Sequence, residues 1–171
     1  MTDKPSSSRA PLLLIAAVAL FMALFFVAAG THRVLIAVPD DAAYYFKIAG
    51  NAAGGRGLTF DGINRTNGFQ PLWLYLLTAV FAVRHAAPET MFRIVLLLQV
   101  VLLACAALLV HSLVARFFSR RTVLLCLALF AFFVFIPSAN GMESGLVVLS
   151  LAAVLSFGVR ARIFVGPDAR R

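Results

Sequence analysis

Charged side chains are scarce in this sequence, and so are cysteine and tryptophan. Asp and Glu together number 7, and only 13% of the residues are charged, against roughly 25% in soluble domains. Hydrophobic residues make up 62% of the chain. This composition excludes an intrinsically disordered chain and argues against a soluble globule, because too few polar residues are present to cover a water-facing surface. The sequence therefore predicts an integral membrane protein.

The two cysteines, Cys105 and Cys126, both lie inside apolar runs and show no metal-ligand spacing. We interpret them as free, buried thiols. The formal net charge is +8, but it does not indicate a nucleic-acid partner. The basic residues are not gathered into one stripe. They lie mainly at the ends of apolar runs, where Lys and Arg fix the orientation of a membrane protein.

Four apolar segments predict membrane-spanning helices. The first, residues 11–29, carries no charge and would extend about 28 Å as a helix. We prefer an uncleaved anchor here. The alternative is a signal peptide cleaved near Ala28-Ala29-Gly30, but the apolar run exceeds the ~7–15 residues of a signal-peptide core. The other predicted spans are residues 91–115, 122–137 and 145–159.

The basic residues predict how these spans are oriented. With four spans, both termini and the densest basic clusters face the cytoplasm, as the positive-inside rule requires. If the short apolar run 69–83 also crossed, the basic loop 116–121 would face outside. We therefore expect an all-α polytopic protein with four spans and with membrane-parallel helices in a long outer loop, although 69–83 as a further span stays open. The expected inner segments are 1–10, 116–121 and 160–171, and the outer ones are 30–90 and 138–144.

One long polar interval interrupts the hydrocarbon, from Pro39 to Trp73. It opens with two adjacent carboxylates, Asp40 and Asp41, directly after an apolar segment. The spacing predicts a helix over 42–53, followed by an irregular, glycine-bounded loop over 58–68. In so apolar a chain, such an interval either binds something polar at the membrane surface or is only a solvated loop. We favour a binding or catalytic site.

The acidic residues are the candidates for catalysis. Carboxylates beside hydrocarbon are costly unless they are paired, hydrated or bound to metal. Asp40 is the candidate general base for an acceptor hydroxyl, and Asp41 is the candidate ligand of a divalent cation. The predicted topology returns Glu143 to the same face, where it could share the metal or the substrate. The alternative is that the Asp pair marks the membrane–water boundary and that Glu143 is a solvated loop residue.

Cations and amides of the outer loop are candidate ligands for a phosphate-bearing substrate. Lys47 lies on the predicted helix, and Arg65, Asn67 and Gln70 follow in the loop. Cations with neighbouring hydrogen-bond donors suit phosphate. Anchoring to lipid headgroups is the alternative. The remaining aromatic residues of this region are interpreted as a belt at the membrane interface: Tyr44, Tyr45, Trp73 and Tyr75.

The run PDDAAYYFKIAGNAAGGRGLTFDGINRTNGFQPLW, followed by apolar spans and the SANGMESGL loop, resembles a known superfamily. It is similar to the amino-terminal part of polytopic GT-C glycosyltransferases, including protein O-mannosyltransferase-like and lipid A aminoarabinose transferase-like enzymes. The resemblance covers roughly residues 11–155. It implies a first span that leads into a long outer loop, which opens with an acidic motif and folds into helices lying along the membrane.

The resemblance also implies a function. GT-C enzymes transfer a sugar from a polyprenyl-phosphate donor to an acceptor, here on the outer face of the plasma (inner) membrane and with inversion. Asp40 would then be the base, Asp41 the second acid of the motif, and Glu143 an acid of a later outer loop.

Members of this superfamily usually have many more spans, so we expect a fragment, a truncated product or one part of a split enzyme whose partner chain supplies the missing spans. The alternative class is a non-catalytic small membrane protein, either an accessory subunit or a truncated remnant. A transporter subunit is less favoured, because no predicted span carries paired charges.

Overall fold

Helices form the regular structure of this chain. The computed structural model describes residues 9–36, 38–83, 86–161 and 163. In chain order the elements are α1 (Ala10–Ala28), α2 (Thr31–Ile36), α3 (Asp40–Ala53), α4 (Pro71–Val83), α5 (Pro88–Val114), α6 (Arg120–Phe130), the π-helical turn η1 (Ala131–Phe135), α7 (Ile136–Ser138) and α8 (Ser144–Arg160). The predicted all-α class is confirmed for the described residues.

Three helical segments are long and apolar enough to cross a membrane. They are α1, α5 and the continuous segment Arg120–Ser138, which joins α6, η1 and α7. These segments match the predicted spans 11–29, 91–115 and 122–137, and each begins slightly before its predicted start. Together they indicate an integral membrane protein.

The two remaining apolar helices are shorter. Helix α8 has 17 residues and α4 has 13, which correspond to about 26 Å and about 20 Å. Both lengths are below the ~30 Å thickness of a bilayer's hydrocarbon core. The predicted fourth span, 145–159, is therefore present as an apolar helix, but its length alone does not establish that it crosses the membrane.

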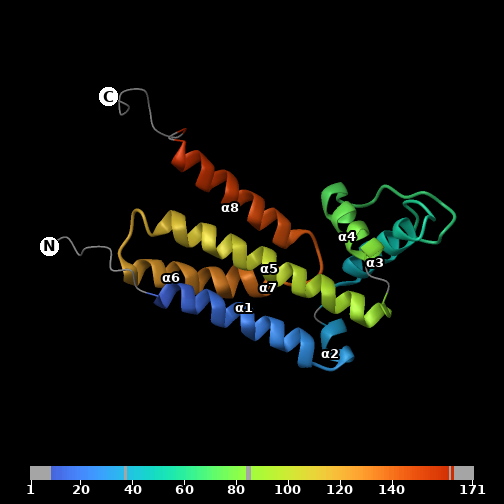
Figure 1. Cartoon of the computed structure of the whole chain (residues 1–171), viewed down its shortest axis with the longest axis horizontal. Coiled ribbons are helices and arrows are strands. Elements are labelled where there is room, and N and C mark those ends of the chain that lie inside the picture. Colours follow the sequence, from blue (N-terminus) through green and yellow to red (C-terminus); the bar gives the residue numbers. More distant parts are fainter. Residues whose placement is uncertain (1–8, 37, 84–85, 162, 164–171) are drawn as a thin grey trace.

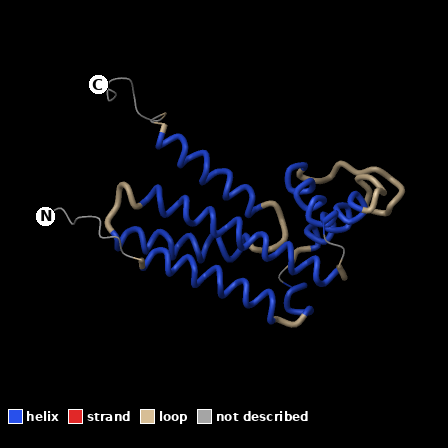
Figure 2. Tube along the Cα trace, in the orientation of Figure 1, coloured by secondary structure: helices blue, strands red, loops and turns tan. Residues whose placement is uncertain are grey.

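The helices form a bundle with its polar elements gathered at one end. Helix α5 packs against α1 and α8, and α1 also packs against α6. Helices α3 and α4 pack against each other beside the amino-terminal end of α5, while α8 diverges from α5 toward its own carboxyl end (Figure 1). The longest loop, between α3 and α4, protrudes from the same end as these two helices (Figure 2).

The opposite end of the bundle holds the start of α1 and the turn between α5 and α6 (Figure 1). Arg9, Arg116, Arg120 and Arg121 belong to these segments, so the basic residues predicted to face the cytoplasm gather at one end. Five further basic residues used to predict the orientation of the spans lie outside the described part of the chain. Four belong to the predicted inner segments and one to the predicted outer loop: Lys4, Arg162, Arg170 and Arg171, and Arg84.

A π-helical turn precedes Pro137 in the third long segment. Proline has no backbone N–H, so it removes one bond of the helical ladder. Just before it, the Ile136 N–H bonds to the Ala131 carbonyl, five residues back. The turn therefore accommodates the proline and lets the helix continue to Ser138.

Arg93 joins the polar end of α5 to the carboxyl end of α1. Its guanidinium donates hydrogen bonds to the backbone carbonyls of Phe26, Val27 and Ala29, at 3.1 Å for Val27 and 2.9 Å for Ala29. The last carbonyls of a helix have no partner within the helix, and a cation there also complements its dipole. Arg93 therefore holds the ends of two candidate spans together.

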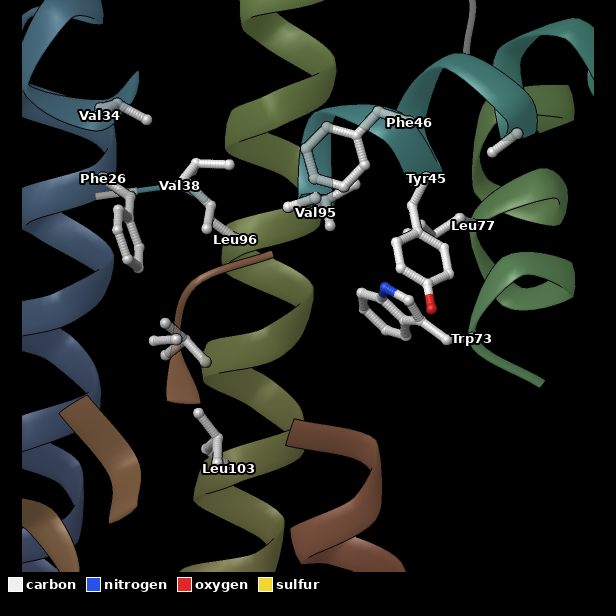
Figure 3. Packing of buried hydrophobic residues seen from close by; sticks show 14 of the residues in the cluster. Phe26, Val34, Val38, Tyr45, Phe46, Trp73, Leu77, Val95, Leu96 and Leu103 are labelled. Carbon is white, nitrogen blue, oxygen red and sulfur yellow. The ribbon is translucent and has the colours of Figure 1, made fainter. Parts of the chain in front are cut away.

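The main hydrophobic core lies where α3, α4, α5 and the end of α1 meet. Figure 3 shows Tyr45 beside Trp73 of α4, while Phe46 lies toward Val95 of α5. Trp73 is completely buried, and Tyr45 is 6% exposed. The prediction that these two residues form part of an interfacial aromatic belt is therefore wrong, because both pack inside the protein. The exposed Tyr75 still suits such a belt.

The cysteines differ in part from the prediction. Both are free thiols, but Cys105 is exposed and Cys126 is half-buried. Cys105 lies on a face of α5 that no other described element covers. In a membrane-spanning helix this face suits hydrocarbon, so an apolar position does not require burial inside the protein.

Candidate functional site

The acidic pair opens α3. Asp40 and Asp41 occupy the first turn of the helix, after Pro39 in extended conformation. The helix uses no hydrogen bond from the N–H at the position before its first turn, so a proline is tolerated at that position. Carboxylates in the first turn are stabilised by the helix dipole by about 0.3–1 kcal/mol. Both carboxylates are exposed. Successive side chains leave a helix about 100° apart, so the two acids belong to different faces of α3.

The Tyr45 phenol is the point at which distant polar groups meet. Its hydroxyl accepts a hydrogen bond from the backbone N–H of Gln70 at 2.9 Å. Asp41 precedes it by one helical turn on the same face. Burial raises the pKa of Tyr45 and the Gln70 bond lowers it, while the charge and hydrogen bonding of Glu143 and, least of all, the charge of Asp41 raise it further. One phenol thus gathers groups from α3, the segment before α4 and the segment before α8.

Glu143 brings an unsatisfied carboxylate oxygen to this cluster. The residue is half-buried, and its Oε2 is buried without any hydrogen-bond partner. A buried polar atom without a partner costs about 1–3 kcal/mol or more. Such an atom is costly in a purely structural residue, but it is available to a ligand that arrives from outside.

The backbone before Glu143 is held by Gln99, a completely buried residue of α5. Gln99 Oε1 accepts from the Gly141 N–H at 2.6 Å, and Gln99 Nε2 donates to the Met142 carbonyl. From the other side, Trp73 Nε1 donates to the Gly141 carbonyl at 3.2 Å. Two buried side chains from α5 and α4 therefore fix the position from which Glu143 reaches Tyr45.

Gly141 allows this segment to touch α3. Its φ is +91°, in the left-handed region that glycine adopts without strain. A Cβ at this position would lie 3.0 Å from Ala42 Cβ and 3.1 Å from Phe46 Cζ. Any larger residue would push the segment away from α3, and Glu143 would move with it.

Asn51 organises the outer loop from the end of α3. Its Nδ2 donates to the carbonyls of Thr59 at 2.9 Å and Phe60 at 3.0 Å, while its Oδ1 accepts from Arg56 Nε at 3.0 Å. The Phe60 ring also stacks on Tyr44, with 4.5 Å between the centroids. The loop predicted as irregular is thus a folded element with defined internal contacts.

Asp61 has a structural role in this loop. Its carboxylate accepts from the backbone N–H of Ile63 at 2.8 Å and of Asn64 at 2.7 Å, and from Asn64 Nδ2 at 2.7 Å. These hydrogen bonds hold the pKa of Asp61 below its usual value, because they favour the charged form. The side chain is exposed and closes a turn, so it is no candidate for catalysis.

The predicted site residues do not all meet. The backbone of Gln70 bonds to Tyr45, and the charges of Glu143 and, more weakly, Asp41 act on the same phenol. Lys47 lies on another face of α3, where it lines a separate cavity. The remaining two predicted ligands are exposed in the outer loop: Arg65, which pairs with Thr59 in an isolated β-bridge, and Asn67, whose carbonyl accepts from the Phe69 N–H.

The described carboxylates do not form a complete metal site. Within the ranges that the structure describes, no three His, Cys, Asp or Glu side chains lie close enough to hold a metal ion. Asp41 and Glu143, however, both act on the same phenol. Mg²⁺ is commonly held by one or two carboxylates, with water and phosphate oxygens completing its shell. Two carboxylates alone would leave the other ligands of such a cation to water and a substrate.

Two residues that organise this site were absent from the predicted set, Gln99 and Gly141. Gln99 was visible as a lone amide within an apolar run, which is a signal of a buried polar contact. Gly141 lies in a short loop among other small residues, so the sequence carried no sign of its role. That role arises because α3 packs closely against the Gly141 backbone.

The comparisons with known proteins give no further support. No protein-family model matches the chain, and neither a curated protein nor a solved structure matches it. The resemblance to GT-C glycosyltransferases therefore stays a prediction that rests on the motifs of the sequence.

Proposed function

We propose that this chain is the amino-terminal part of a GT-C-type membrane glycosyltransferase. The observation that carries the proposal is the buried Tyr45 phenol at the end of an apolar helical bundle, which accepts a hydrogen bond from the Gln70 N–H and feels the charges of Glu143 and Asp41. The two acids are 102 positions apart in the sequence. The buried Glu143 Oε2 without a partner supports a ligand site, because leaving that oxygen unpaired is costly.

In this proposal Asp40 is the general base. It is exposed in the first turn of α3 and could take the proton from an acceptor hydroxyl. The acceptor oxygen bonds to the anomeric carbon of the sugar as the bond from that carbon to the phosphate oxygen of the polyprenyl donor breaks. Direct displacement of this kind inverts the anomeric carbon, and the leaving group is the polyprenyl phosphate.

Negative charge on the leaving phosphate must be offset for this step to proceed. Asp41 and Glu143 would hold a divalent cation, which when bound stabilises the phosphate charge. Arg65, Asn67 and Gln70 lie on the segment that leads from the outer loop to α4 and would supply hydrogen bonds to the substrate. Of these three, Gln70 is the one whose backbone reaches the Tyr45 cluster.

The proposal includes a topology. Helices α1, α5, Arg120–Ser138 and α8 would form four spans, with the termini on the cytoplasmic side of the plasma membrane. Helices α3 and α4 would lie along its outer face. The length of α4 supports this arrangement, because its 13 residues fall below the ~17–25 residues of a spanning helix, whereas the 17 residues of α8 reach the lower end of that range.

The test is the substitution Asp40→Asn in the protein purified from membranes, alone or as part of a longer gene product. Loss of a general base costs about 10²–10⁴-fold in rate, so we expect sugar transfer from a polyprenyl-phosphate donor to fall by that factor. Carbonate extraction should show unchanged membrane insertion. Glu89→Gln, which changes an exposed acid in the first turn of α5, is the matched control and should retain activity. Wild-type rates in Asp40→Asn would refute the mechanism.

A second candidate is a non-catalytic membrane protein, an accessory subunit or a truncated remnant. The observation that favours it is the placement of both aspartates in the first turn of α3, where the helix dipole alone stabilises them. The two proposals differ in ligand binding. An enzyme binds the polyprenyl-phosphate sugar by itself or with the partner chain that completes it, whereas a non-catalytic chain shows no binding that depends on Asp40, Asp41 or Glu143.

A further inference from the structure

Two Asn-Gly pairs occur in this sequence, Asn67-Gly68 in the outer loop and Asn140-Gly141 before α8. Asparagine is one of the chemically labile residues of proteins. Its side-chain carbonyl carbon can be attacked by the backbone nitrogen of the next residue, which closes a succinimide ring. Glycine in that next position favours the attack, because it has no Cβ to crowd the nitrogen and its backbone turns freely. Any difference between the two pairs therefore comes from the fold.

The first pair is open to this reaction. It lies in the loop between α3 and α4, which protrudes from the bundle (Figure 2), and both of its residues are exposed. In the part of the chain that the structure describes, neither the Asn67 side chain nor the Gly68 N–H makes a hydrogen bond. A Cβ built on Gly68 would have Thr66 Oγ1, 4.0 Å away, as its nearest atom beyond the adjoining residues. The attacking nitrogen and the attacked carbon are therefore both free of tertiary contacts.

The second pair is held in place. Gly141 is buried, and its N–H donates to Gln99 Oε1 at 2.6 Å. Asn140 Oδ1 accepts from the Met142 N–H at 3.1 Å and from the Ser144 hydroxyl at 3.3 Å. The nitrogen that would attack is engaged in a buried hydrogen bond, and the amide that would be attacked is fixed by two more. The fold therefore protects this pair.

Two related sequences in the outer loop are restrained by a single turn. Asn64 precedes Arg65, whose side chain crowds the next nitrogen, and Asn64 Nδ2 donates to Asp61 Oδ2 at 2.7 Å. Asp61 precedes Gly62, but ring closure at an aspartate requires the protonated acid. The hydrogen bonds to Asp61 hold its pKa below the usual value and so favour the charged form. Asn67 is therefore the exposed amide of this loop that remains unrestrained.

We propose that Asn67 is a site of spontaneous deamidation in the folded protein. The Gly68 nitrogen bonds to the Asn67 side-chain carbonyl carbon. The side-chain nitrogen leaves as ammonia, which takes up the Gly68 amide proton. Water then opens the succinimide at either carbonyl and yields aspartate or isoaspartate. This inference goes beyond the proposed transfer reaction, because it requires no chemistry at Asp40.

The product alters a segment that two neighbouring tyrosines hold at both ends. Before the reactive pair, Thr66 Oγ1 and the Tyr44 hydroxyl are hydrogen-bonded at 3.2 Å. After it, the Gln70 N–H donates to the Tyr45 hydroxyl at 2.9 Å. Isoaspartate routes the main chain through Cβ and adds a methylene to this short segment, and both products add a negative charge. Conversion should therefore strain the Gln70–Tyr45 hydrogen bond and lower the stability of the folded chain.

The experiment is a time course of the purified full chain in a nonionic detergent, at neutral and at mildly alkaline pH. Samples are digested with pepsin at acid pH, which stops the reaction, and are mapped by tandem mass spectrometry. We expect a gain of about 1 Da at Asn67, because –OH replaces –NH₂, and electron-transfer fragmentation should identify isoaspartate. The rate should rise with pH, because the attacking nitrogen must lose its proton. In heavy-oxygen water the product should carry the heavy isotope.

The second pair is the internal control. Asn140 should react about tenfold or more slowly than Asn67 in the folded protein, because the buried Gly141 hydrogen bond has to break first. In the chain unfolded by dodecyl sulfate and urea, the two pairs should react at comparable rates, since both are Asn-Gly. This comparison separates the effect of the fold from that of the local sequence.

Two variants test the chemistry at the first pair. Gly68→Ala should slow the reaction, because a Cβ crowds the attacking nitrogen, and the open surroundings of Gly68 should let the fold persist. Asn67→Gln should block it, because the longer side chain closes a larger ring much more slowly. The thermal midpoint of aged wild-type protein should fall below that of fresh protein, whereas aged and fresh Asn67→Gln should have equal midpoints.

Four results would overturn the proposal. The first is an unmodified Asn67 in folded protein over the time in which the unfolded chain converts. The second is equal rates at Asn67 and Asn140 in the folded protein, or an Asn140 that stays slow after unfolding. The third is a wild-type rate in Gly68→Ala. The fourth, an unchanged midpoint after conversion at Asn67, would refute the link to the Tyr45 hydrogen bond. None of these results bears on the Asp40→Asn test, so the two proposals fail separately.

Discussion

Tyr45 is the residue whose environment says most about the candidate site. Its phenol packs beside Trp73 and accepts a hydrogen bond from the backbone N–H of Gln70. The charges of Glu143 and Asp41 also act on it. These groups come from α3 itself, from the stretch at the start of α4 and from the segment before α8. A buried phenol next to negative charge is held in its neutral form, because ionisation would add a further negative charge in a poorly solvated place.

This environment predicts a specific dependence of stability on pH. The pKa of Tyr45 is raised above 10.0 in the folded state, so its contribution to stability is fully present below pH 10. The contribution is lost as the pH rises through the raised value, because the unfolded chain releases the proton more easily. Thermal unfolding in detergent, followed from pH 8 upward, should therefore show a loss of stability above pH 10.

Tyr45→Phe tests this assignment. At neutral pH the variant should be less stable by about 1–2 kcal/mol, because the Gln70 N–H loses its acceptor. Above pH 10 the difference from wild type should shrink, since phenylalanine has no proton to lose. Tyr75→Phe, at a tyrosine 57% exposed, is the control and should follow the wild-type curve. A constant difference between Tyr45→Phe and wild type at every pH would contradict the assignment.

At the scale of elements, the segment between α7 and α8 has to be placed against α3 before Glu143 can reach Tyr45. Gln99 holds it from α5 and Trp73 holds it from α4. Gly141 supplies the contact, with a left-handed φ and with Ala42 and Phe46 so close that a Cβ would force them to shift. The sequence predicted the position of Glu143 from topology alone, but the contacts that bring it close depend on side chains 42 or more positions apart.

Gly141→Ala should therefore destabilise the protein by about 1–3 kcal/mol, because it adds both backbone strain at φ +91° and overpacking against Ala42 and Phe46. A lowered thermal midpoint in detergent is the measurement. Gly30→Ala is the matched control, since a Cβ there meets no atom within 4 Å, and it should leave the midpoint nearly unchanged. Equal midpoints for the two variants would mean that the segment does not pack on α3 as described.

At the scale of the whole molecule, the arrangement separates a polar end from a basic end. The first holds α3, α4 and the outer loop, and the second holds the start of α1 and the α5–α6 turn (Figure 1). Helix α5 has 27 residues, about 40 Å, which is enough to carry the chain from one side of a bilayer to the other. The two ends should therefore face different compartments.

Cysteine labelling tests this topology. In a background without Cys105 and Cys126, single cysteines replace three exposed residues: Gly68 before α4, Ala87 after α4 and Phe118 after α5. An impermeant maleimide applied to intact cells should label the first two, because the proposed topology keeps α4 on the outer face. Phe118→Cys should react only after permeabilisation. Opposite behaviour of Gly68→Cys and Ala87→Cys would show that α4 crosses the membrane and that the four-span arrangement is wrong.

The sequence by itself determined the class of this protein and the position of its long helices. The length and charge of an apolar run are local properties, so three long apolar helices and the helix after Asp40 could be predicted to within a few residues. The acidic pair at the start of α3 could be placed for the same reason.

Only the tertiary structure decided which polar groups share a site. It brought the charge of Glu143, and more weakly that of Asp41, to bear on the Tyr45 phenol, and it placed Lys47 at a separate cavity on another face of α3. It also buried Tyr45 and Trp73, which composition had suggested for the membrane interface. These outcomes depend on helical phase and on the packing of segments far apart in the chain, and no local pattern of residues carries that information.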